Sequence, residues 1–302
     1  MKSNSEKLGK EINSKKPAVS NSRLGSHFLG KLEISIDRIT VVGDLKKDQS
    51  KKLNRELKFN PYVQLYETGE ERFKADIPTV CHAEYDFLKA KSLDRKNMRV
   101  EFNPNNLNDE HKHMIYDLFI SKMVSRSFSR LDVAFDTDVD LSNYYAYMSG
   151  QHAQMKKTIF YGKNGRPETK YFGTRKSDRY IRIYNKKQEL LDNKEIEIES
   201  DHFWRIEVEL KRSRTEEWKN CLQSLNFVQP DWKSIKSNSE RATVYMLIHE
   251  EDEWGNLSKN GKSKYRKILK EISPINLTDD LNYVLNQNSQ RIQNELNFWL
   301  GE

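Results

Sequence analysis

A strict alternation of apolar and polar side chains runs through Arg179-Tyr180-Ile181-Arg182-Ile183-Tyr184-Asn185-Lys186. Successive side chains of an extended chain point to opposite faces of a sheet, so Ile181 and Ile183 face a core. The opposite face carries Tyr180, Arg182, Tyr184 and Lys186. The stretch therefore predicts a β-strand with one apolar face and one face that holds phenols and cations.

Residues 130–136 and 204–210 alternate in the same way. Their apolar faces consist of leucine, isoleucine, valine and phenylalanine. Their polar faces, together with a short predicted strand at residues 98–102, carry Asp132, Asp136, Glu207, Glu209 and Glu101. If these strands are neighbours, one face of the sheet brings carboxylates, a cation and a phenol together.

Further runs rich in β-branched and aromatic residues predict strands at residues 32–42, 62–66, 158–161 and 170–172. Asn164-Gly165 lies between the last two and is typical of a tight hairpin turn. Apolar residues at helical spacing predict helices at residues 108–123 and 215–225. The expected fold is α+β, with a largely antiparallel central β-sheet, flanking helices and a C-terminal helical region.

The chain divides into three predicted regions. Residues 1–26 hold too few apolar side chains to offset the entropy of ordering them, which predicts a mobile N-terminal arm. Residues 27–230 form the α+β domain. Residues 231–302 are helical in pattern, without strand signals after Pro230. The last helix starts at a predicted N-cap, Thr278, and its apolar stripe is Leu281, Leu285, Ile292, Leu296 and Trp299.

The composition favours a polyanionic partner. Lysine and arginine total 52 of the 302 residues against 45 aspartate and glutamate, a formal charge of +7. Nucleic acid is the first candidate and an anionic membrane surface the second. Neither a membrane span nor a signal peptide is visible, so we expect a cytoplasmic protein with no membrane partner.

Cys81 and Cys221 predict reduced, buried thiols rather than a disulfide framework or metal site.

The carboxylates on separate strands suggest a metal site. The polar side chains of a single alternating strand usually mean only that one face of the sheet is exposed to solvent. Acidic residues are depleted in strands, however, and like charges on facing strands repel each other. A divalent cation with oxygen ligands, Mg²⁺ or Mn²⁺, would explain their gathering.

A tyrosine beside such a cation suggests phosphodiester chemistry. The phenol has a pKa near ~10, so almost none is ionised at neutral pH. A cation on the phosphate and a nearby carboxylate, lysine or arginine would assist the attack. The product is a phosphotyrosine link to one DNA end, and spacing alone leaves the polarity of that link open.

Several motifs closely resemble the Rep_trans family, the replication initiators of small rolling-circle plasmids of Gram-positive bacteria. The most specific are KTIFYG at residues 157–162, ETKYFG at 168–173 and SDRYIRIYNKKQE at 177–189. The resemblance extends to RKNMRVEFNP at 95–104, SRLD at 129–132, WRIEVELK at 204–211 and KEISP at 270–274. It runs from about residue 20 to residue 299.

The resemblance implies a relaxase-like nicking domain and a homodimer. Such a protein binds the plasmid's double-strand origin DNA and nicks one strand through the tyrosine of the Ile-Tyr-Asn-Lys motif, here Tyr184. The tyrosine becomes linked to the 5′ end, a free 3′ hydroxyl primes replication, and the ends are rejoined at termination. The resemblance also implies dependence on Mg²⁺ or Mn²⁺ and recruitment of a host helicase of the PcrA type.

Asp132, Glu207 and Glu101 are the first candidates for metal ligands, and Asp136 and Glu209 the second. Arg182 and Lys186, on the tyrosine's face, are candidates for neutralising the phosphate. Tyr180 is the competing nucleophile, because it shares that face about 13 Å away. Position and family resemblance favour Tyr184. His111 and His113 lie in a predicted helix, where residues two apart face different ways, and we interpret them as solvated.

A basic segment near the C-terminus consists of Lys259, Lys262, Lys264, Tyr265, Arg266 and Lys267. It is either a solvated helix start or a DNA-contacting surface. The resemblance implies that this segment discriminates between plasmid origins.

Two other functions remain open. A relaxase of a mobile or conjugative element would use the same site on a transfer origin. A non-catalytic, sequence-specific DNA-binding regulator would explain the charge but not the carboxylates.

Overall fold

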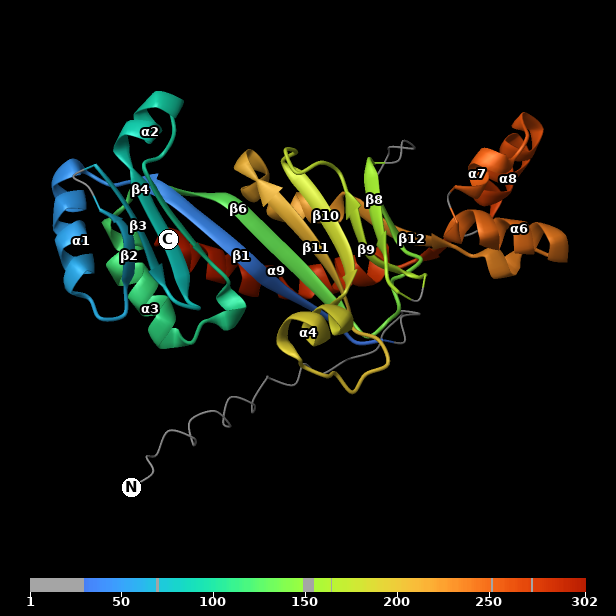
Figure 1. Ribbon diagram of the computed structural model, residues 1–302, viewed down its shortest axis with the longest axis horizontal. Helices are drawn as coiled ribbons and strands as arrows, with labels where there is room; N and C mark the ends of the chain where they lie inside the picture. Colours follow the sequence, from blue (N-terminus) through green and yellow to red (C-terminus); the bar gives the residue numbers. More distant parts are fainter. Residues whose placement is uncertain (1–29, 69–70, 149–154, 164, 251, 273) are drawn as a thin grey trace, which may run out of the picture.

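A ten-stranded antiparallel sheet forms the centre of the computed structural model, which describes residues 30–68, 71–148, 155–163, 165–250, 252–272 and 274–302 (Figure 1). The strand order is β2-β3-β4-β5-β1-β6-β11-β10-β9-β8, and neighbouring strands pair antiparallel. The bounds are β1 (Leu32–Asp44), β2 (Gln64–Thr68), β3 (Arg72–Ile77), β4 (Cys81–Asp86), β5 (Met98–Phe102), β6 (Val124–Thr137), β8 (Lys157–Tyr161), β9 (Pro167–Phe172), β10 (Arg179–Asn185) and β11 (Trp204–Lys211). The predicted α+β class with a largely antiparallel sheet is confirmed.

Helices cover one face of this sheet. The long helix α9 (Thr278–Leu300) runs behind the strands in Figure 1 and contacts β1 and β6. The predicted stripe of α9, from Leu281 to Trp299, is buried as expected. The remaining helices around the sheet are α1 (Lys47–Phe59), α2 (Phe87–Leu93), α3 (Asp109–Leu118), α4 (Lys186–Lys194) and α5 (Trp218–Gln223), with short 3₁₀ turns at Pro104–Asn106, Ile120–Lys122, Arg212–Thr215 and Trp232–Ser234.

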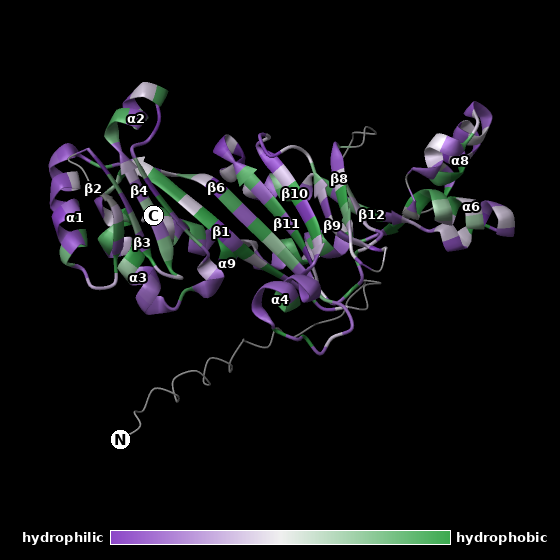
Figure 2. Ribbon diagram, in the orientation of Figure 1, coloured by the Kyte–Doolittle hydropathy of each residue, from purple (hydrophilic) through white to green (hydrophobic). Residues whose placement is uncertain are grey.

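We call the sheet face opposite α9 the open face. In Figure 2 the central strands are striped with hydrophobic and hydrophilic residues, as alternation requires. The hydrophobic members, such as Val133, Val208 and Ile181, belong to the core that α9 completes. The hydrophilic members therefore lie on the open face.

A second, three-stranded sheet has the order β13-β12-β7, from Pro274–Asn276, Leu225–Pro230 and Tyr145–Met148. Beyond it project α6 (Asn238–His249), α7 (Glu253–Asn256) and α8 (Lys259–Glu271) (Figure 1). Ile235, Val244 and Ile248 form a small core among these helices, separate from the main one. Residues 231–302 thus contribute to both cores, because α9 belongs to the main core.

The local sequence pattern predicted a few elements wrongly. The expectation of no strand after Pro230 was wrong, because β13 pairs with β12. Thr278 does not cap its own helix: Leu277 holds the N-cap position, and the Thr278 hydroxyl accepts a hydrogen bond from the Phe227 amide at 2.9 Å. Strands β3 and β4 were also missed, since their charged residues have low strand propensity.

A lysine is fully buried on the core side of β9. The Nζ atom of Lys170 donates hydrogen bonds to the carbonyl oxygens of Leu141, Ser142 and Tyr144, at 2.8, 2.8 and 2.5 Å. Burial lowers the pKa of Lys170 to about 7. This side chain ties the loop before β7 to the main sheet.

The predicted N-terminal arm lies outside the described residues. Both cysteines are buried and free, as predicted. In the part of the chain that is described, no helix is long and apolar enough to cross a membrane.

Candidate active site

The three alternating strands are direct neighbours, in the order β6-β11-β10. Asp132 of β6 lies opposite Glu209 of β11, and Glu209 lies opposite Tyr180 of β10. Two residues along, Glu207 lies opposite Arg182. The predicted meeting of carboxylates, cations and phenols on one face is therefore present. Glu101 is more remote, because β1 separates β5 from β6.

Arg130 joins two of the carboxylates. Its Nε and Nη2 atoms donate to the two oxygens of Asp132 at 2.8 and 2.6 Å. The same Nη2 lies 2.5 Å from Oε2 of Glu209, which also pairs with Lys211. Asp132 and Glu209 are 1% and 5% exposed. Two buried carboxylates thus converge on one point, which a guanidinium nitrogen fills.

The other predicted ligands are paired with arginines as well. Arg182 Nη2 donates to Oε2 of Glu207 at 2.6 Å. Arg205 donates to both oxygens of Asp136, at 2.6 and 2.7 Å. Burying an acid among these strands is possible because each negative charge has a fixed cation.

Arg38 of β1 connects Glu101 to this network. Its Nη1 donates to Glu101 at 3.2 Å, and its Nε lies 4.0 Å from Asp132. Arg99 and the Thr40 hydroxyl also donate to Glu101. Glu101 therefore lies at the edge of the network, two strands from Asp132.

The carboxylates remain electrostatically crowded. Burial raises the pKa of Asp132 to about 6, and the charges of Glu207 and Glu209 add to the rise while Arg130 opposes it. Oxygen donors of this kind suit Mg²⁺ or Mn²⁺. Among the described residues, no group of three or more acidic, histidine or cysteine side chains is placed to hold a metal ion.

Tyr184 lies next to this network, where β10 ends. It is opposite Arg205 of β11 and is only 3% exposed. The Arg182 guanidinium lies 4.1 Å from the centre of its ring, and Lys186 Nζ 5.6 Å. Burial raises the pKa of Tyr184 and Glu207 adds to the rise, whereas Arg205 and Arg182 lower it. The phenol is thus held protonated under two cations.

The chain leaves the sheet one residue after Tyr184, because β10 ends at Asn185. Asn185 is the N-cap of α4, and its side chain accepts a hydrogen bond from the Gln188 amide at 3.1 Å. Lys186 is the first residue of α4 rather than part of the strand. Its Nζ pairs with Glu189 at 2.5 Å.

Sequence reasoning missed three members of the network as charge partners: Asp37, Arg38 and Arg130. Alternation alone could have found Arg130, because it lies two residues before Asp132 on the same strand. Asp37 could not be found this way, because it falls at a bulge of β1 between Ile36 and Arg38. Its carboxylate accepts a hydrogen bond from Arg205 Nη1 at 2.7 Å.

The two histidines singled out in the sequence lie on α3, outside the carboxylate strands. His113 Nδ1 is 2.7 Å from the Asp109 carbonyl oxygen. In the described residues neither belongs to a metal-binding group.

The basic C-terminal segment forms most of α8. Ser258 caps the helix by accepting from the Gly261 amide at 3.1 Å. Lys264 pairs with Glu240 at 2.8 Å, and Lys267 with Glu271 at 3.8 Å. Tyr265 packs against the small core. Lys259, Lys262 and Arg266, spaced by three and four residues, share another side of the helix.

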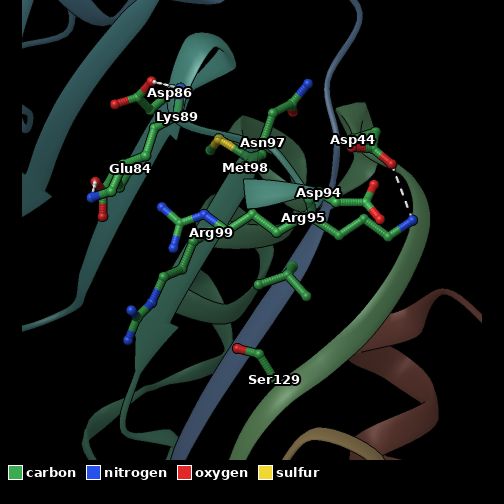
Figure 3. Close-up of a pocket in the computed structure, with 12 residues that line it drawn as sticks. Asp44, Glu84, Asp86, Lys89, Asp94, Arg95, Asn97, Met98, Arg99 and Ser129 are labelled. Atoms are coloured by element: carbon green, nitrogen blue, oxygen red, sulfur yellow. Dashed lines mark hydrogen bonds and ion pairs between the residues drawn. The ribbon is translucent and has the colours of Figure 1, made fainter. Parts of the chain in front are cut away.

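A pocket of about 770 Å³ opens on the other half of the sheet, between α2, β1 and β5 (Figure 3). Its lining mixes cations with carboxylates, among them Lys89, Arg95, Arg99, Glu84 and Asp94. It includes none of the predicted catalytic residues. The chemistry therefore points to the open face at β6, β11 and β10 rather than to this pocket.

Known proteins resemble nearly the whole of this chain. A family model described as "Replication initiation protein, N-terminal" matches residues 38–123, and one described as "Replication initiation factor" matches residues 126–294. The matches define a replication initiator. The chain belongs to the Rep_trans family of replication initiation factors.

Curated relatives support this membership over nearly the full length. A replication initiation protein of Staphylococcus aureus is 46% identical over 293 residues, covering 96% of this chain and 92% of the relative. A second from the same organism is 45% identical with the same coverage. A solved rolling-circle replication initiator from Geobacillus stearothermophilus is 16% identical, with a TM-score of 0.42, over 70% of this chain and 91% of that one.

Proposed function

We propose that this protein initiates rolling-circle replication of a plasmid by nicking one strand of the double-strand origin with Tyr184. One observation carries the proposal: Tyr184 is the last residue but one of β10, beside buried carboxylates and arginines, and the chain turns into α4 after Asn185. The attack of the phenol on phosphorus forms the phosphotyrosine bond and releases the 3′ oxygen of the cut strand. The reverse reaction rejoins ends at termination.

Arg182 and Lys186 have two successive tasks in this proposal. Without DNA they cover the ring of Tyr184. An arriving phosphate attracts both cations, which uncovers the phenol and neutralises charge on the phosphorane-like transition state. The proton of Tyr184 leaves toward a carboxylate of the network, and Glu207 is the candidate because its charge acts on Tyr184 and it pairs with Arg182.

Asp132 and Glu209 are the carboxylates best placed to hold Mg²⁺ or Mn²⁺, since their oxygens converge on Arg130 Nη2. Glu207 is next along the strand, while Asp136 and Glu101 are farther along the network. When bound, the cation would supply Lewis-acid stabilisation of the scissile phosphate. Arg130 Nη2 would have to move away from that position to admit the cation.

The remaining parts of the proposal concern partners. Helix α8 contacts origin DNA and sets specificity, with Lys259, Lys262 and Arg266 as phosphate contacts. The protein acts in the cytoplasm as a homodimer, and a host helicase of the PcrA type unwinds from the nick. The family membership supports these assignments.

Incubation of the protein with supercoiled plasmid carrying the origin, in the presence of Mg²⁺, tests the proposal. We expect relaxed circles and a covalent protein–DNA adduct that survives denaturation. A non-catalytic regulator can give neither product. A relaxase of a mobile element would give both, but on a transfer origin instead of the replication origin.

A further inference from the structure

Three aromatic side chains lie side by side on the open face, next to the proposed nucleophile. They are Phe160 of β8, Tyr171 of β9 and Tyr180 of β10. The rings of Tyr171 and Tyr180 are stacked, with centroids 5.5 Å apart and planes inclined by 16°. Phe160 packs edge-on against Tyr171 at 5.8 Å. Together we call them the aromatic row.

The strand register places this row beside Tyr184. Tyr171 lies opposite Arg182, and Thr169 lies opposite both Tyr184 and Phe160. Neighbouring strands are about 4.8 Å apart, so Phe160 lies about 10 Å across the sheet from β10. A nucleic acid strand that presents a phosphate to Tyr184 therefore has neighbouring bases within reach of these rings.

The aromatic row is partly exposed to solvent. Phe160 is 56% exposed, and the rings of Tyr171 and Tyr180 are half-buried. Core aromatics of this protein, such as Phe172 on the other side of β9, are buried. Cross-strand aromatic pairs do stabilise sheets, but that role does not require a phenylalanine ring left in water.

The surroundings carry the charge that suits a polyanion. The Arg175 guanidinium lies 5.3 Å from the ring centre of Tyr180. Arg182 lies between Tyr180 and Tyr184 on β10. Stacked aromatic rings flanked by cations are the usual surface for unpaired bases, because rings stack on bases while cations contact the backbone.

We propose that Phe160, Tyr171 and Tyr180 form a stacking platform for unpaired bases of single-stranded DNA beside the scissile phosphate. This inference rests on the proposed role of Tyr184. The platform holds the strand by its base faces, so it does not read sequence. It would leave origin choice to other surfaces and fix the position of the opened strand over the nucleophile.

The test separates base stacking from phosphate attraction. Binding of two single strands of equal length, an oligothymidine and a strand of abasic sites, is measured by fluorescence anisotropy with full-length Tyr184→Phe protein. Both strands carry the same phosphates, so a difference in affinity comes from the bases, and the ring substitutions below assign it to stacking. We expect the oligothymidine to bind more tightly, by roughly 5- to 150-fold for each stacked base.

Phe160→Ala and Tyr171→Ala in the same background should each remove most of this preference and leave abasic-strand binding unchanged. Tyr171→Phe should retain it, which guards against a folding defect of the alanine variant. Phe59→Ala is the matched control, because Phe59 is an 88% exposed aromatic on α1 at the far end of the sheet. An unchanged preference in Phe160→Ala and Tyr171→Ala would overturn the proposal.

Two further outcomes have defined meanings. If Phe160→Ala changes the oligomeric state in light scattering but not the preference for bases, the row is an interface between copies and the proposal fails. If the base preference depends on the row but the covalent adduct maps to another tyrosine, the platform stands and the assignment of Tyr184 fails.

Discussion

The network on β6, β11 and β10 and the helix α8 both concentrate charge, but they hold it differently. In the network Asp132, Glu207 and Glu209 are buried and Asp136 is half-buried, and each is fixed by arginines from its own or neighbouring strands. On α8 the cations are largely exposed, and Lys264 and Lys267 pair with glutamates at the surface. Buried pairs lose much when one partner is removed, whereas surface pairs contribute little.

This difference suits two tasks. A chemical step needs groups held in one geometry, which burial and strand register provide. Attraction of DNA needs several solvated cations that each act weakly and in parallel. We therefore expect single substitutions to be decisive in the network and only joint substitutions to matter on α8.

The largest effect should come from Tyr184→Phe. The variant should melt and bind origin DNA like the parent, yet form no covalent adduct on a denaturing gel, because the attacking oxygen is gone. Tyr180→Phe, the matched control, should remain active, since its ring stacks on Tyr171 without the hydroxyl. Mass spectrometry that places the DNA-linked peptide at Tyr180, Tyr161 or Tyr171 would refute the assignment.

Asp132→Asn and Glu207→Gln should each slow nicking by about 100-fold or more while origin binding persists. Each change weakens a buried pair and lowers the melting temperature, but α8 remains, so the folded variant still binds origin DNA while the chemical step suffers. Loss of both nicking and origin binding in a well-folded variant would contradict the assignment of these carboxylates to the chemical step.

The crowding of Asp132, Glu207 and Glu209 also predicts an effect of metal on stability. Millimolar Mn²⁺ or Mg²⁺ should raise the melting temperature of the wild type, and less so that of Asp132→Asn, because a ligand of the native state stabilises it. The melting temperatures are measured by differential scanning fluorimetry. If the metal shifts the melting temperatures of the wild type and of Asp132→Asn equally, the result argues against a cation at Asp132.

Lys170 offers a buried cation to compare with those of α8. Lys170→Met should cost about 3 kcal/mol, because three carbonyls lose their donor. Lys259→Met, the same change on exposed α8, should cost almost nothing in urea unfolding.

The difference in free energy of unfolding between the wild type and Lys170→Met should depend on pH. Burial lowers the pKa of Lys170 to about 7, below its ordinary 10.5, so the unfolded chain holds the proton to higher pH than the folded protein. The free energy of unfolding of the wild type should therefore rise relative to Lys170→Met between about pH 7 and pH 10. If the difference in free energy of unfolding between the two proteins does not change across this range, Lys170 keeps its proton in the folded protein.

The smallest effect concerns α8. Joint neutralisation of Lys259, Lys262 and Arg266 should flatten the log–log salt dependence of origin binding by roughly 0.9 for each lost phosphate contact. The ion-paired Lys264 and Lys267, replaced together, should change the slope less. Equal slopes for both variants and the parent would place the DNA on another surface.

Much of the fold could be predicted because strand alternation is a local property. The alternation within each segment predicts its apolar face without reference to the rest of the chain. This holds for residues 130–136, 179–185 and 204–210, and all three apolar faces belong to the core, as predicted. The basic helix and the stripe of α9 follow from helical spacing in the same way. Strands β3 and β4 were less visible, because their polar residues are charged, although alternate residues such as Phe73, Ala75 and Tyr85 are buried.

The sequence by itself determined which residues share a face, since that depends only on the repeat of the backbone. It also determined the position of Tyr184 at a strand end, because the Asn185 cap is local. Only the tertiary structure decided which charges meet: Arg205 reaches Asp37 across 168 residues, and a bulge in β1 sets that contact. Register, bulges and strand order arise from pairing of distant segments, and no local pattern encodes them.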